Sequence, residues 1–302
     1  MRRFRAVLLF TIMILGLSAA VGMTTRPRRH VLLIGIDGCR FDALVAANTP
    51  RLRGLIANGA FARRVALRAP GHTESHTVSG PGWNTILSGL WPHQHGTFSN
   101  TFPPPATSLD VFTRIRRARP ASFTASFADW APINRYFARA DHAPPAADPE
   151  PDYARADERL ASAFTATLAR RAPDLAFLYF GQVDEEGHRG GFDTANPGYR
   201  AALARVDALV GDALDAVEAR RRDRGEAWLV LVTTDHGGQG RCHDFLDHVP
   251  AELDSFVILE GDGVERGAIA GPVGLIDVTP TVLAYLDVPR DPALPGRPLA
   301  LR

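Results

Sequence analysis

Three short runs of apolar residues limit what this chain can fold into more than any other feature. They are residues 31–36 (VLLIGI), 175–180 (LAFLYF) and 228–232 (WLVLV), and residues 256–259 (FVIL) form a further run. An unbroken apolar run of this length is typical of a strand that is covered on both faces, as in a parallel sheet. The sequence therefore predicts a buried sheet with these runs as its strands.

Helical segments separate the apolar runs. Residues 49–59 and 196–225 each begin with a capping residue followed by proline and end at glycine, and a last capped helix is expected over residues 281–286. Proline at the first helical position and glycine after the last are common helix boundaries. Strands that alternate with helices predict an α/β fold, with a mostly parallel central sheet and helices on both faces.

The length of 302 residues and the 45% hydrophobic content suffice for one large α/β domain or two smaller ones. We expect a single catalytic domain over residues 30–302. Residues 98–152 contain three consecutive prolines and a stretch rich in proline and alanine, which interrupt the periodicity. We interpret this region as a small, irregular, cap-like excursion over a site.

Residues 1–23 are predicted to be a targeting segment. Three arginines precede the apolar residues 6–17, and small residues follow at 18–20. This pattern is typical of a signal peptide, while the continuation of the apolar stretch to residue 23 leaves an uncleaved N-terminal anchor as the alternative. In both cases we expect an exported protein, periplasmic or secreted, with membrane contact only if the segment is retained.

The charged residues exclude some functions. The formal net charge is +1 and the chain has no lysine, so Schiff-base and P-loop lysine chemistry is excluded. The charge balance gives no nucleic-acid signal, and a small molecule is the expected partner. Cys39 and Cys242 are compatible with an oxidising compartment; they form either one disulfide or two unpaired thiols.

Polar side chains follow three of the apolar runs. Asp37 follows the first run, Asp184 and His188 follow the second, and Asp235, His236 and His243 follow the third. Each residue alone has an ordinary explanation, such as a helix cap or a solvated side chain. However, the carboxyl ends of parallel strands meet at one edge of a sheet, where ligands bind. Together these residues therefore predict a metal site.

The donor types narrow the choice of metal. Carboxylates mixed with imidazoles suit zinc, manganese or iron better than calcium. Six protein ligands exceed what one tetrahedral ion takes, so two ions about 4 Å apart are expected. His248 is an alternative to His243 as the last ligand.

A hydroxyl nucleophile is expected near such a pair of ions. Ser79 precedes Gly80-Pro81-Gly82 in "TVSGPGWNTILSGL", and a helix is predicted over residues 83–90. This order places the Ser79 hydroxyl at the positive end of a helix dipole, where an anion binds well. Thr77 is the alternative nucleophile.

Five motifs together resemble those of the alkaline phosphatase superfamily, and most closely its branch of type I phosphodiesterases and nucleotide pyrophosphatases. They are "VLLIGIDGCR", "SGPGWNTILSGLWPHQHG", "VDEEGH", "TTDHGGQGRCH" and "DVTPTVLAYLDVP". The resemblance implies that two zinc ions are bound. It places Asp37, Asp235 and His236 on one zinc and Asp184, His188 and His243 on the other. It also implies that Ser79 contacts the metals and is the nucleophile that forms a covalent phospho-enzyme.

The sequence departs from the family pattern near the nucleophile. The phosphodiesterase branch has threonine there, and one of its asparagines binds a phosphoryl oxygen; Asn84 or the amides of the helix start are the candidates for that role here. Sulfatases need an arginine where this chain has Trp83. The sequence thus predicts a metal-dependent hydrolase of phosphoric esters, a phosphodiesterase, pyrophosphatase or phosphatase. A sulfatase-like enzyme and a non-catalytic exported metal-binding protein are the alternatives.

Four further histidines have no place in this scheme. His72 and His76 lie in "GHTESH", where glycine and proline nearby predict a loop, so a solvated or substrate-rim position is expected. His93 and His95 in "WPHQHG" are expected to pack against, or cap, the helix that follows Ser79.

Overall fold

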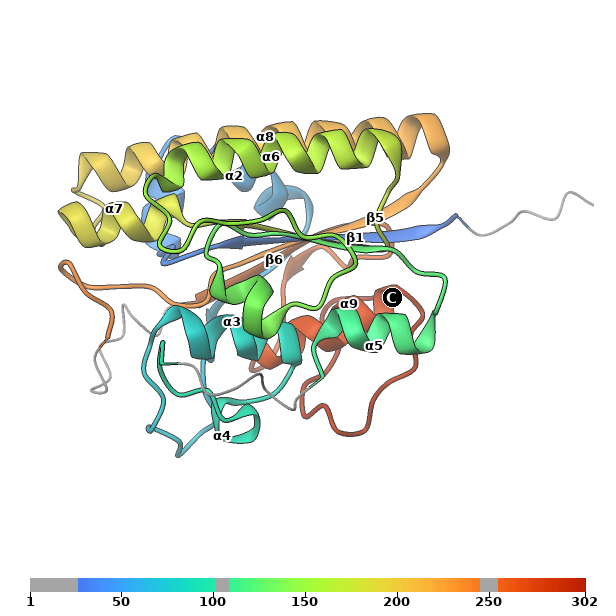
Figure 1. Ribbon diagram of the computed structural model, residues 1–302, viewed down its shortest axis with the longest axis horizontal. Helices are drawn as coiled ribbons and strands as arrows, with labels where there is room; N and C mark the ends of the chain where they lie inside the picture. Colours follow the sequence, from blue (N-terminus) through green and yellow to red (C-terminus); the bar gives the residue numbers. More distant parts are fainter. Residues whose placement is uncertain (1–26, 102–108, 245–254) are drawn as a thin grey trace, which may run out of the picture.

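The computed structural model describes residues 27–101, 109–244 and 255–302 (Figure 1). The predicted targeting segment and His248 lie outside these residues. Among the helices that are described, none combines the length and the apolar character needed to cross a membrane.

Seven described strands form one sheet in the order β3-β4-β1-β5-β6-β2-β7. Their bounds are β1 Arg29–Ile36, β2 Ala60–Val65, β3 Thr124–Phe127, β4 Leu175–Phe180, β5 Ala227–Thr233, β6 Ser255–Gly261 and β7 Gly267–Ala268. The strands β3, β4, β1 and β5 are parallel to one another, whereas β6 runs antiparallel to both β5 and β2. The predicted mostly parallel α/β fold is confirmed.

The central strand β1 lies between β4 and β5, the two strands that follow it among the predicted apolar runs. Ile36 is in register with Phe180 of β4, and Gly35 is in register with Thr233 of β5. The carboxyl ends of the three strands therefore lie side by side at one edge of the sheet. This alignment is the feature of the fold that positions the site.

Helices cover both faces of the sheet (Figure 1). The helices are α1 Phe41–Ala46, α2 Pro50–Asn58, α3 Ser79–Ser88, α4 Pro92–His95, α5 Val111–Ala118, α6 Tyr153–Arg170, α7 Gln182–Gly190, α8 Pro197–Arg224 and α9 Val278–Tyr285, with a π-helix at Ile133–Phe137 and a 3₁₀ turn at Leu275–Asp277. Figure 1 shows α2, α6 and α8 on one side of the sheet and α3, α5 and α9 on the other.

Two hydrophobic cores result, one on each face. Along β1, Leu32 and Ile34 belong to the core under α8, while Val31 and Leu33 belong to the core over α3 and α9. Successive side chains of a strand point to opposite faces, so a strand buried on both faces needs an unbroken apolar sequence. This explains why the run is continuous and does not alternate with polar residues.

Two predicted helix starts agree with the structure, and two predicted helices begin earlier. One of these is α9, which begins at Val278, three residues before the predicted residue 281. The helices α2 and α8 begin at Pro50 and Pro197, and α8 ends before Gly225, which has a φ of +62°. The helix α3 begins at Ser79, four residues before the predicted start at Trp83. Ser79 is consequently a residue of the first helical turn and not part of a preceding loop.

Described residues within 98–152 form α5, β3 and the π-helix. The strand β3 pairs in parallel with β4 at the edge of the main sheet, and Phe112 and Ile115 of α5 are buried in the core beside α9. The region therefore contributes to the main sheet and to its core. The division of the whole chain into a leader and a single catalytic domain stays a prediction.

Candidate metal centre and active site

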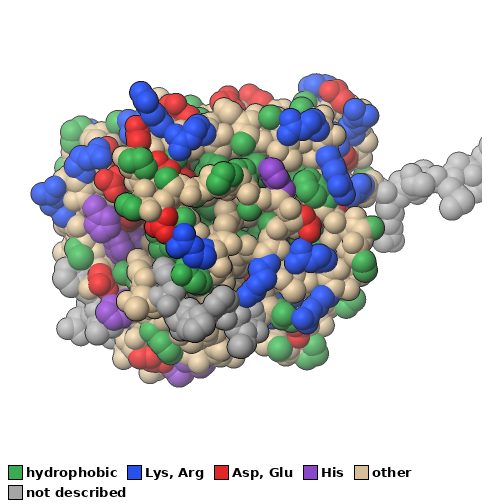
Figure 2. Space-filling model, viewed as in Figure 1, with side chains coloured by type: hydrophobic (Ala, Val, Ile, Leu, Met, Phe, Trp, Pro, Cys, Tyr) green, Lys and Arg blue, Asp and Glu red, His purple; other side chains and the backbone are tan. Residues whose placement is uncertain are grey.

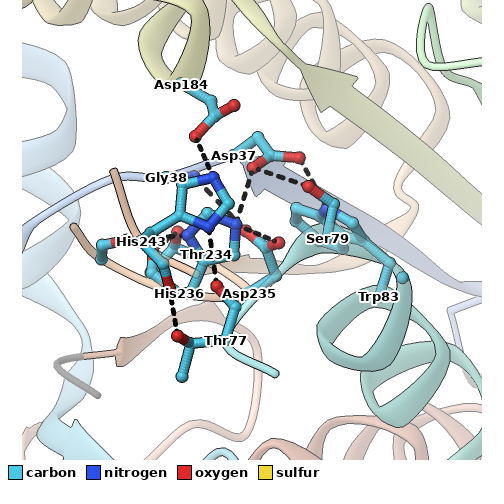
Figure 3. A network of polar contacts seen from close by, with 12 residues as sticks. Asp37, Gly38, Thr77, Ser79, Trp83, Asp184, Thr234, Asp235, His236 and His243 are labelled. Carbon is cyan, nitrogen blue, oxygen red and sulfur yellow. Dashed lines mark hydrogen bonds and ion pairs between the residues drawn. The ribbon is translucent and has the colours of Figure 1, made fainter. Parts of the chain in front are cut away.

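The six predicted ligand residues lie together at the carboxyl ends of β1, β4 and β5. Figure 3 shows Asp37, Asp184, Asp235, His236 and His243. They form two groups, in each of which the candidate ligand atoms lie within 4.8 Å of one another. The first group is Asp37, Asp235 and His236, and the second is Asp184, His188 and His243. The division is the same as the one implied by the family resemblance.

The first group is buried. Asp37 comes directly after β1, and Asp235 and His236 follow β5. The Nε2 atom of His236 lies 3.4 Å from Oδ1 of Asp37 and 3.2 Å from Oδ2 of Asp235. The backbone N–H of Gly38 donates to the other Asp235 oxygen at 3.3 Å. The three side chains thus converge on one point beneath the edge of the sheet.

The second group lies nearer the surface. Asp184 and His188 are four residues apart on α7, which places them on one face of that helix. Nε2 of His188 lies 3.3 Å from Asp184 Oδ2, and Nε2 of His243 lies 3.5 Å from Asp184 Oδ1. The two Nε2 atoms are 2.9 Å apart. His188 is exposed and His243 is buried, so this group connects the interior with the surface.

Each of the three histidines has its Nδ1 atom next to a backbone carbonyl. The distances are 2.8 Å from His236 to Gly237 O, 3.1 Å from His188 to Arg241 O and 2.7 Å from His243 to Thr77 O. An Nδ1–H that donates to a carbonyl leaves the lone pair of Nε2 for a metal, an arrangement that is usual around metal-bound histidine.

Several atoms of these groups are buried with no hydrogen-bond partner among the described residues. They are Asp184 Oδ1, Asp235 Oδ2 and His236 Nε2. A buried carboxylate oxygen without a donor is costly, and a cation removes that cost. The unpartnered atoms and the mixed oxygen and nitrogen donors therefore fit divalent metal ions of the zinc type.

Burial and close contact between charged side chains shift the pKa values of the residues in both ligand groups. Burial, together with the charge of Asp184, raises the pKa of Asp37, and burial and the charge of Asp37 raise that of Asp235. Burial also lowers the pKa of His243 to about 3, whereas the hydrogen bond to Asp184 raises that of His188 to about 9. Divalent cations would stabilise the ionised carboxylates and the neutral imidazoles that metal binding requires.

Two aromatic side chains hold Asp37, and neither contact could be inferred from the sequence. The indole Nε1–H of Trp83 donates to Asp37 Oδ2 at 2.9 Å, and the phenol of Tyr179 donates to the same oxygen at 2.6 Å. The other oxygen, Oδ1, faces Ser79 and His236. Both aromatics occur within apolar stretches, where sequence alone suggests only core packing.

Ser79 lies beside Asp37 and lines the same solvent-accessible cavity as the ligand residues. Its hydroxyl donates to Asp37 Oδ1 at 3.4 Å (Figure 3). Gly82, one turn further along α3, packs directly on Asp235: a Cβ at this position would lie 2.6 Å from the Asp235 Cβ. The absence of a side chain at Gly82 is what lets the first turn of α3 approach the ligand loop.

A cavity of about 300 Å³ opens in front of Ser79. Its wall includes ligands of both groups, Asn100 and a set of aromatic residues. The aromatic residues are Trp130, Tyr153 and Tyr179. Figure 2 shows histidine side chains at the surface of the end of the molecule where Figure 1 places α7. The cavity therefore gives a small molecule access to Ser79 and to both ligand groups.

Asn100 is a further residue that the sequence did not single out. Its Oδ1 accepts a hydrogen bond of 2.7 Å from the backbone N–H of Gly80, beside Ser79. Its amide group is therefore fixed at the start of α3, and Asn100 lines the cavity. Asn100 is 21 positions after Ser79 in a segment without regular structure, so no local pattern reveals this contact.

Other candidate residues lie elsewhere. Asn84 is buried, and its amide donates to Thr97 Oγ1 at 3.0 Å, so it is not part of the cavity wall. Thr77 is also buried, and its hydroxyl donates to the backbone carbonyl of His243. Cys39 and Cys242 are both free thiols, which agrees with the unpaired alternative.

Comparison with known proteins defines the family. Residues 31–287 match the family model of type I phosphodiesterase / nucleotide pyrophosphatase. The protein belongs to this family. It is 25% identical over 224 residues to an uncharacterized pyrophosphatase/phosphodiesterase of Schizosaccharomyces pombe, an alignment that covers 68% of this chain and 44% of that protein. It is 30% identical over 148 residues to the 2,3-bisphosphoglycerate-independent phosphoglycerate mutase of Dinoroseobacter shibae, covering 47% and 26%. The chain spans less than half the length of these curated relatives.

Several solved structures share the fold of this protein. A 2-O GAG sulfatase matches with a TM-score of 0.69 and 16% identity, covering 91% of this chain and 73% of that one. Murine ectonucleotide pyrophosphatase / phosphodiesterase 5, an inactive form in complex with AMP, matches with a TM-score of 0.63 and 16% identity, covering 87% and 96%. Identities at this level show the fold alone. The predicted resemblance to type I phosphodiesterases and nucleotide pyrophosphatases is confirmed by the family model.

Proposed function

We propose that the protein hydrolyses phosphoric esters at a dinuclear metal site, with Ser79 as the nucleophile. The observation that supports this most directly is the position of the Ser79 hydroxyl. It lies 3.4 Å from Asp37 Oδ1, at the first turn of a helix, at the wall of a cavity that both ligand groups share. The family membership supports the same class of reaction.

The two ligand groups would hold two divalent ions, and zinc is the best match for carboxylate and imidazole donors. Bound there, the ions would supply Lewis-acid stabilisation of the attacking and leaving oxygens and of the charge on the phosphoryl group. Asp37, Asp235 and His236 would hold one ion. Asp184, His188 and His243 would hold the other, and the Ser79 hydroxyl would face both.

The residues of the chain account for the remaining steps. Ser79 Oγ loses its proton and attacks phosphorus, which forms a bond between the serine oxygen and phosphorus. The bond from phosphorus to the leaving alcohol breaks, and that alcohol gains a proton. Water then attacks the phosphoserine, which releases the phosphoryl group and restores the Ser79 hydroxyl. The start of α3 favours the negative charge of the bound group.

Asn100 is the residue that we assign to a phosphoryl oxygen, in place of Asn84. Its side-chain oxygen accepts a hydrogen bond from the backbone N–H of Gly80. The amide N–H groups of Asn100 are therefore the donors that we assign to a ligand in the cavity. The buried amide of Asn84 already donates to Thr97.

The alternative of a sulfuric-ester hydrolase is tested by direct comparison. Bis-p-nitrophenyl phosphate, p-nitrophenyl phosphate and p-nitrophenyl sulfate are offered to the same preparation, with and without a chelator. We expect chelator-sensitive release of p-nitrophenol from a phosphate substrate and none from the sulfate. Faster turnover of the sulfate would contradict the proposal. No turnover of any substrate, with both metal ions bound, would favour a metal-binding protein without catalysis.

The nucleophile is tested with Ser79→Ala. This variant should lose at least about a thousandfold in turnover, because attack by the serine oxygen is removed. Its zinc content by elemental analysis should stay at the wild-type value, since the six side chains that would hold the ions are unchanged. An active Ser79→Ala enzyme would refute the role of Ser79, and Thr77→Ala is the control for the alternative hydroxyl.

A further inference from the structure

We propose that His72, Glu74 and His93 form an additional site for a zinc-type divalent ion at the surface of the molecule. The three residues come from two segments, the loop before α3 and the short helix α4. The site is separate from the centre described above, because none of the three residues lines the cavity or belongs to the two ligand groups. It therefore does not depend on the proposed catalytic function.

The three side chains are already close to one another. Nδ1 of His72 lies 2.8 Å from Oε1 of Glu74, and the rings of His72 and His93 stack with their centroids 3.8 Å apart and 9° between their planes. One candidate ligand atom from each residue lies within 4.8 Å of the others. Tetrahedral zinc bonds of about 2.0–2.1 Å separate ligand atoms by about 3.3 Å. Rotation of these side chains, which are only partly buried or exposed, can close the remaining gap.

The backbone on both sides is held in place before any ion binds. On α4, the side chain of Gln94 accepts a hydrogen bond from Trp91 N at 3.0 Å, and Gly96 ends the helix with a φ of +76°. On the loop, the guanidinium of Arg68 donates to the carbonyls of Thr73 and Ser75 at 3.3 and 3.0 Å. An ion that joins two such fixed segments costs little additional chain entropy.

The donor set indicates the class of ion. Two imidazoles and one carboxylate are the protein ligands of many zinc sites that keep one position for water. The other first-row ions that favour imidazole, copper and nickel, would also bind. Figure 2 shows a histidine side chain at the surface in the region where Figure 1 places α4. A hydrated ion can therefore reach the site directly from solvent.

The loop that carries His72 and Glu74 connects the additional site with the candidate metal centre. The loop continues through His76, whose N–H donates to Phe98 O at 2.8 Å, to Thr77, whose carbonyl accepts from His243 at 2.7 Å. An ion bound by His72, Glu74 and His93 would brace this loop against α4. It would thereby restrict the segment that leads into α3.

The test counts bound zinc ions. Wild-type protein and His93→Ala are saturated with zinc at low micromolar excess, passed over a desalting column and compared by elemental analysis and calorimetric titration. We expect His93→Ala to bind one zinc ion fewer per chain than the wild type. The difference is the readout, so the result does not depend on how many ions the strand-end groups bind. Equal zinc content in the two proteins would overturn the proposal.

Two further variants make the result specific. Glu74→Gln replaces the carboxylate without changing its size and should weaken the same binding event at least tenfold. His142→Ala removes another exposed histidine, which belongs to none of the ligand groups of the described residues, and should leave the zinc content unchanged. A loss of zinc in His142→Ala equal to that in His93→Ala would indicate nonspecific binding by surface histidines and would also overturn the proposal.

Discussion

Asp37 shows how aromatic side chains of a hydrophobic core can orient a candidate metal ligand. Tyr179 and Trp83 direct two donors at one carboxylate oxygen, which fixes the orientation of the side chain and leaves the other oxygen toward Ser79 and His236. Both donors also favour the ionised form of Asp37 against the effect of burial, which raises its pKa. Partners of a metal ligand commonly affect metal affinity by 10- to 100-fold.

Tyr179→Phe should therefore weaken zinc binding by about 10- to 100-fold, because Asp37 loses one of its two fixed donors. Competition against a chromogenic chelator measures the affinity. Tyr285→Phe is the matched control, since this buried phenol has no hydrogen-bond partner among the described residues. If both variants bound zinc equally well, the supporting role of Tyr179 would be wrong.

The candidate ligands could be predicted from sequence because each follows an apolar run closely, either directly, in the next helix or in the next loop. A residue that follows an apolar run lies at the carboxyl end of the corresponding strand, and this position can be read from the sequence. Asn100 and Tyr179 could not be found in this way. The contact of Asn100 depends on the path of a loop, and Tyr179 lies inside an apolar strand where it resembles a core residue.

Among the elements, α3 depends on a close approach that only glycine allows. Gly82 faces Asp235 with no space for a Cβ, whereas Gly54 of α2 has no heavy atom within 4 Å of the corresponding position. The two glycines both lie inside helices and differ only in their surroundings, so they form a matched pair.

Gly82→Ala should displace Asp235, lower zinc affinity and reduce the free energy of unfolding by more than about 1 kcal/mol, since overpacking strains a close-packed region. Gly54→Ala should instead raise it by about 0.4–1 kcal/mol, because alanine restricts the unfolded chain. Urea denaturation and zinc titration of the two variants measure both effects. Equal behaviour of the pair would contradict the packing argument.

A pair of buried carboxyl groups lies where α6 meets the ends of β3 and β4. Asp157 on α6 accepts from the Gly181 and Gln182 amides at 3.0 and 3.3 Å, while neither oxygen of Asp129 has a donor among the described residues. Burial raises the pKa of Asp157 from 3.8 to about 6, and burial and the charge of Asp157 raise that of Asp129 well above its usual value. These raised pKa values predict that the pair holds one proton at neutral pH.

This pair should make the protein less stable as the pH rises. The folded state holds the proton more tightly than the unfolded chain, so the free energy of unfolding falls as the pH rises above about 4. In Asp129→Asn the side-chain amide can still donate a hydrogen bond to Asp157, but residue 129 no longer has a carboxyl group that titrates. At pH 8 the variant should be more stable than the wild type by more than about 1 kcal/mol, with a smaller difference at pH 4. Denaturation at both pH values is the measurement, and a variant less stable at pH 8 would disprove the shared proton.

The elements differ in how well sequence predicts them. The strands β1, β4 and β5 are evident because a strand buried on both faces must be apolar throughout. The strand β2 has the mixed sequence AFARRV, and β3 has four residues, so pairing with β6 and β4 defines them more than their own composition. The antiparallel direction of β6 was equally hidden, since an apolar run indicates burial and not direction.

At the scale of the whole molecule, the centre joins segments from residue 37 to residue 243 around the central strand β1. Ions that bind only the folded state stabilise it by mass action. For a site at a hundredfold excess of metal over its Kd this amounts to about 2.7 kcal/mol.

Removal of metal with a chelator should therefore lower the Tm by several degrees, and added zinc should restore it. Asp184→Asn should show a smaller shift, because one ligand group is incomplete. Scanning calorimetry with and without the chelator provides the comparison. An unchanged Tm in the wild type would mean that the groups at the strand ends contribute no metal-dependent stability.

The direction of β1 places the segment before the strand and the candidate ligands at opposite ends of the molecule. The strand is eight residues long, which corresponds to about 26 Å, and it separates Arg29 from the candidate ligands after Ile36. Figure 1 shows the start of β1 and the helix α7 at opposite ends of the molecule. A fusion partner, a resin or a surface tether joined ahead of β1 would therefore lie at the end of the molecule opposite α7, whose residues line the cavity, and would leave the cavity open to solvent.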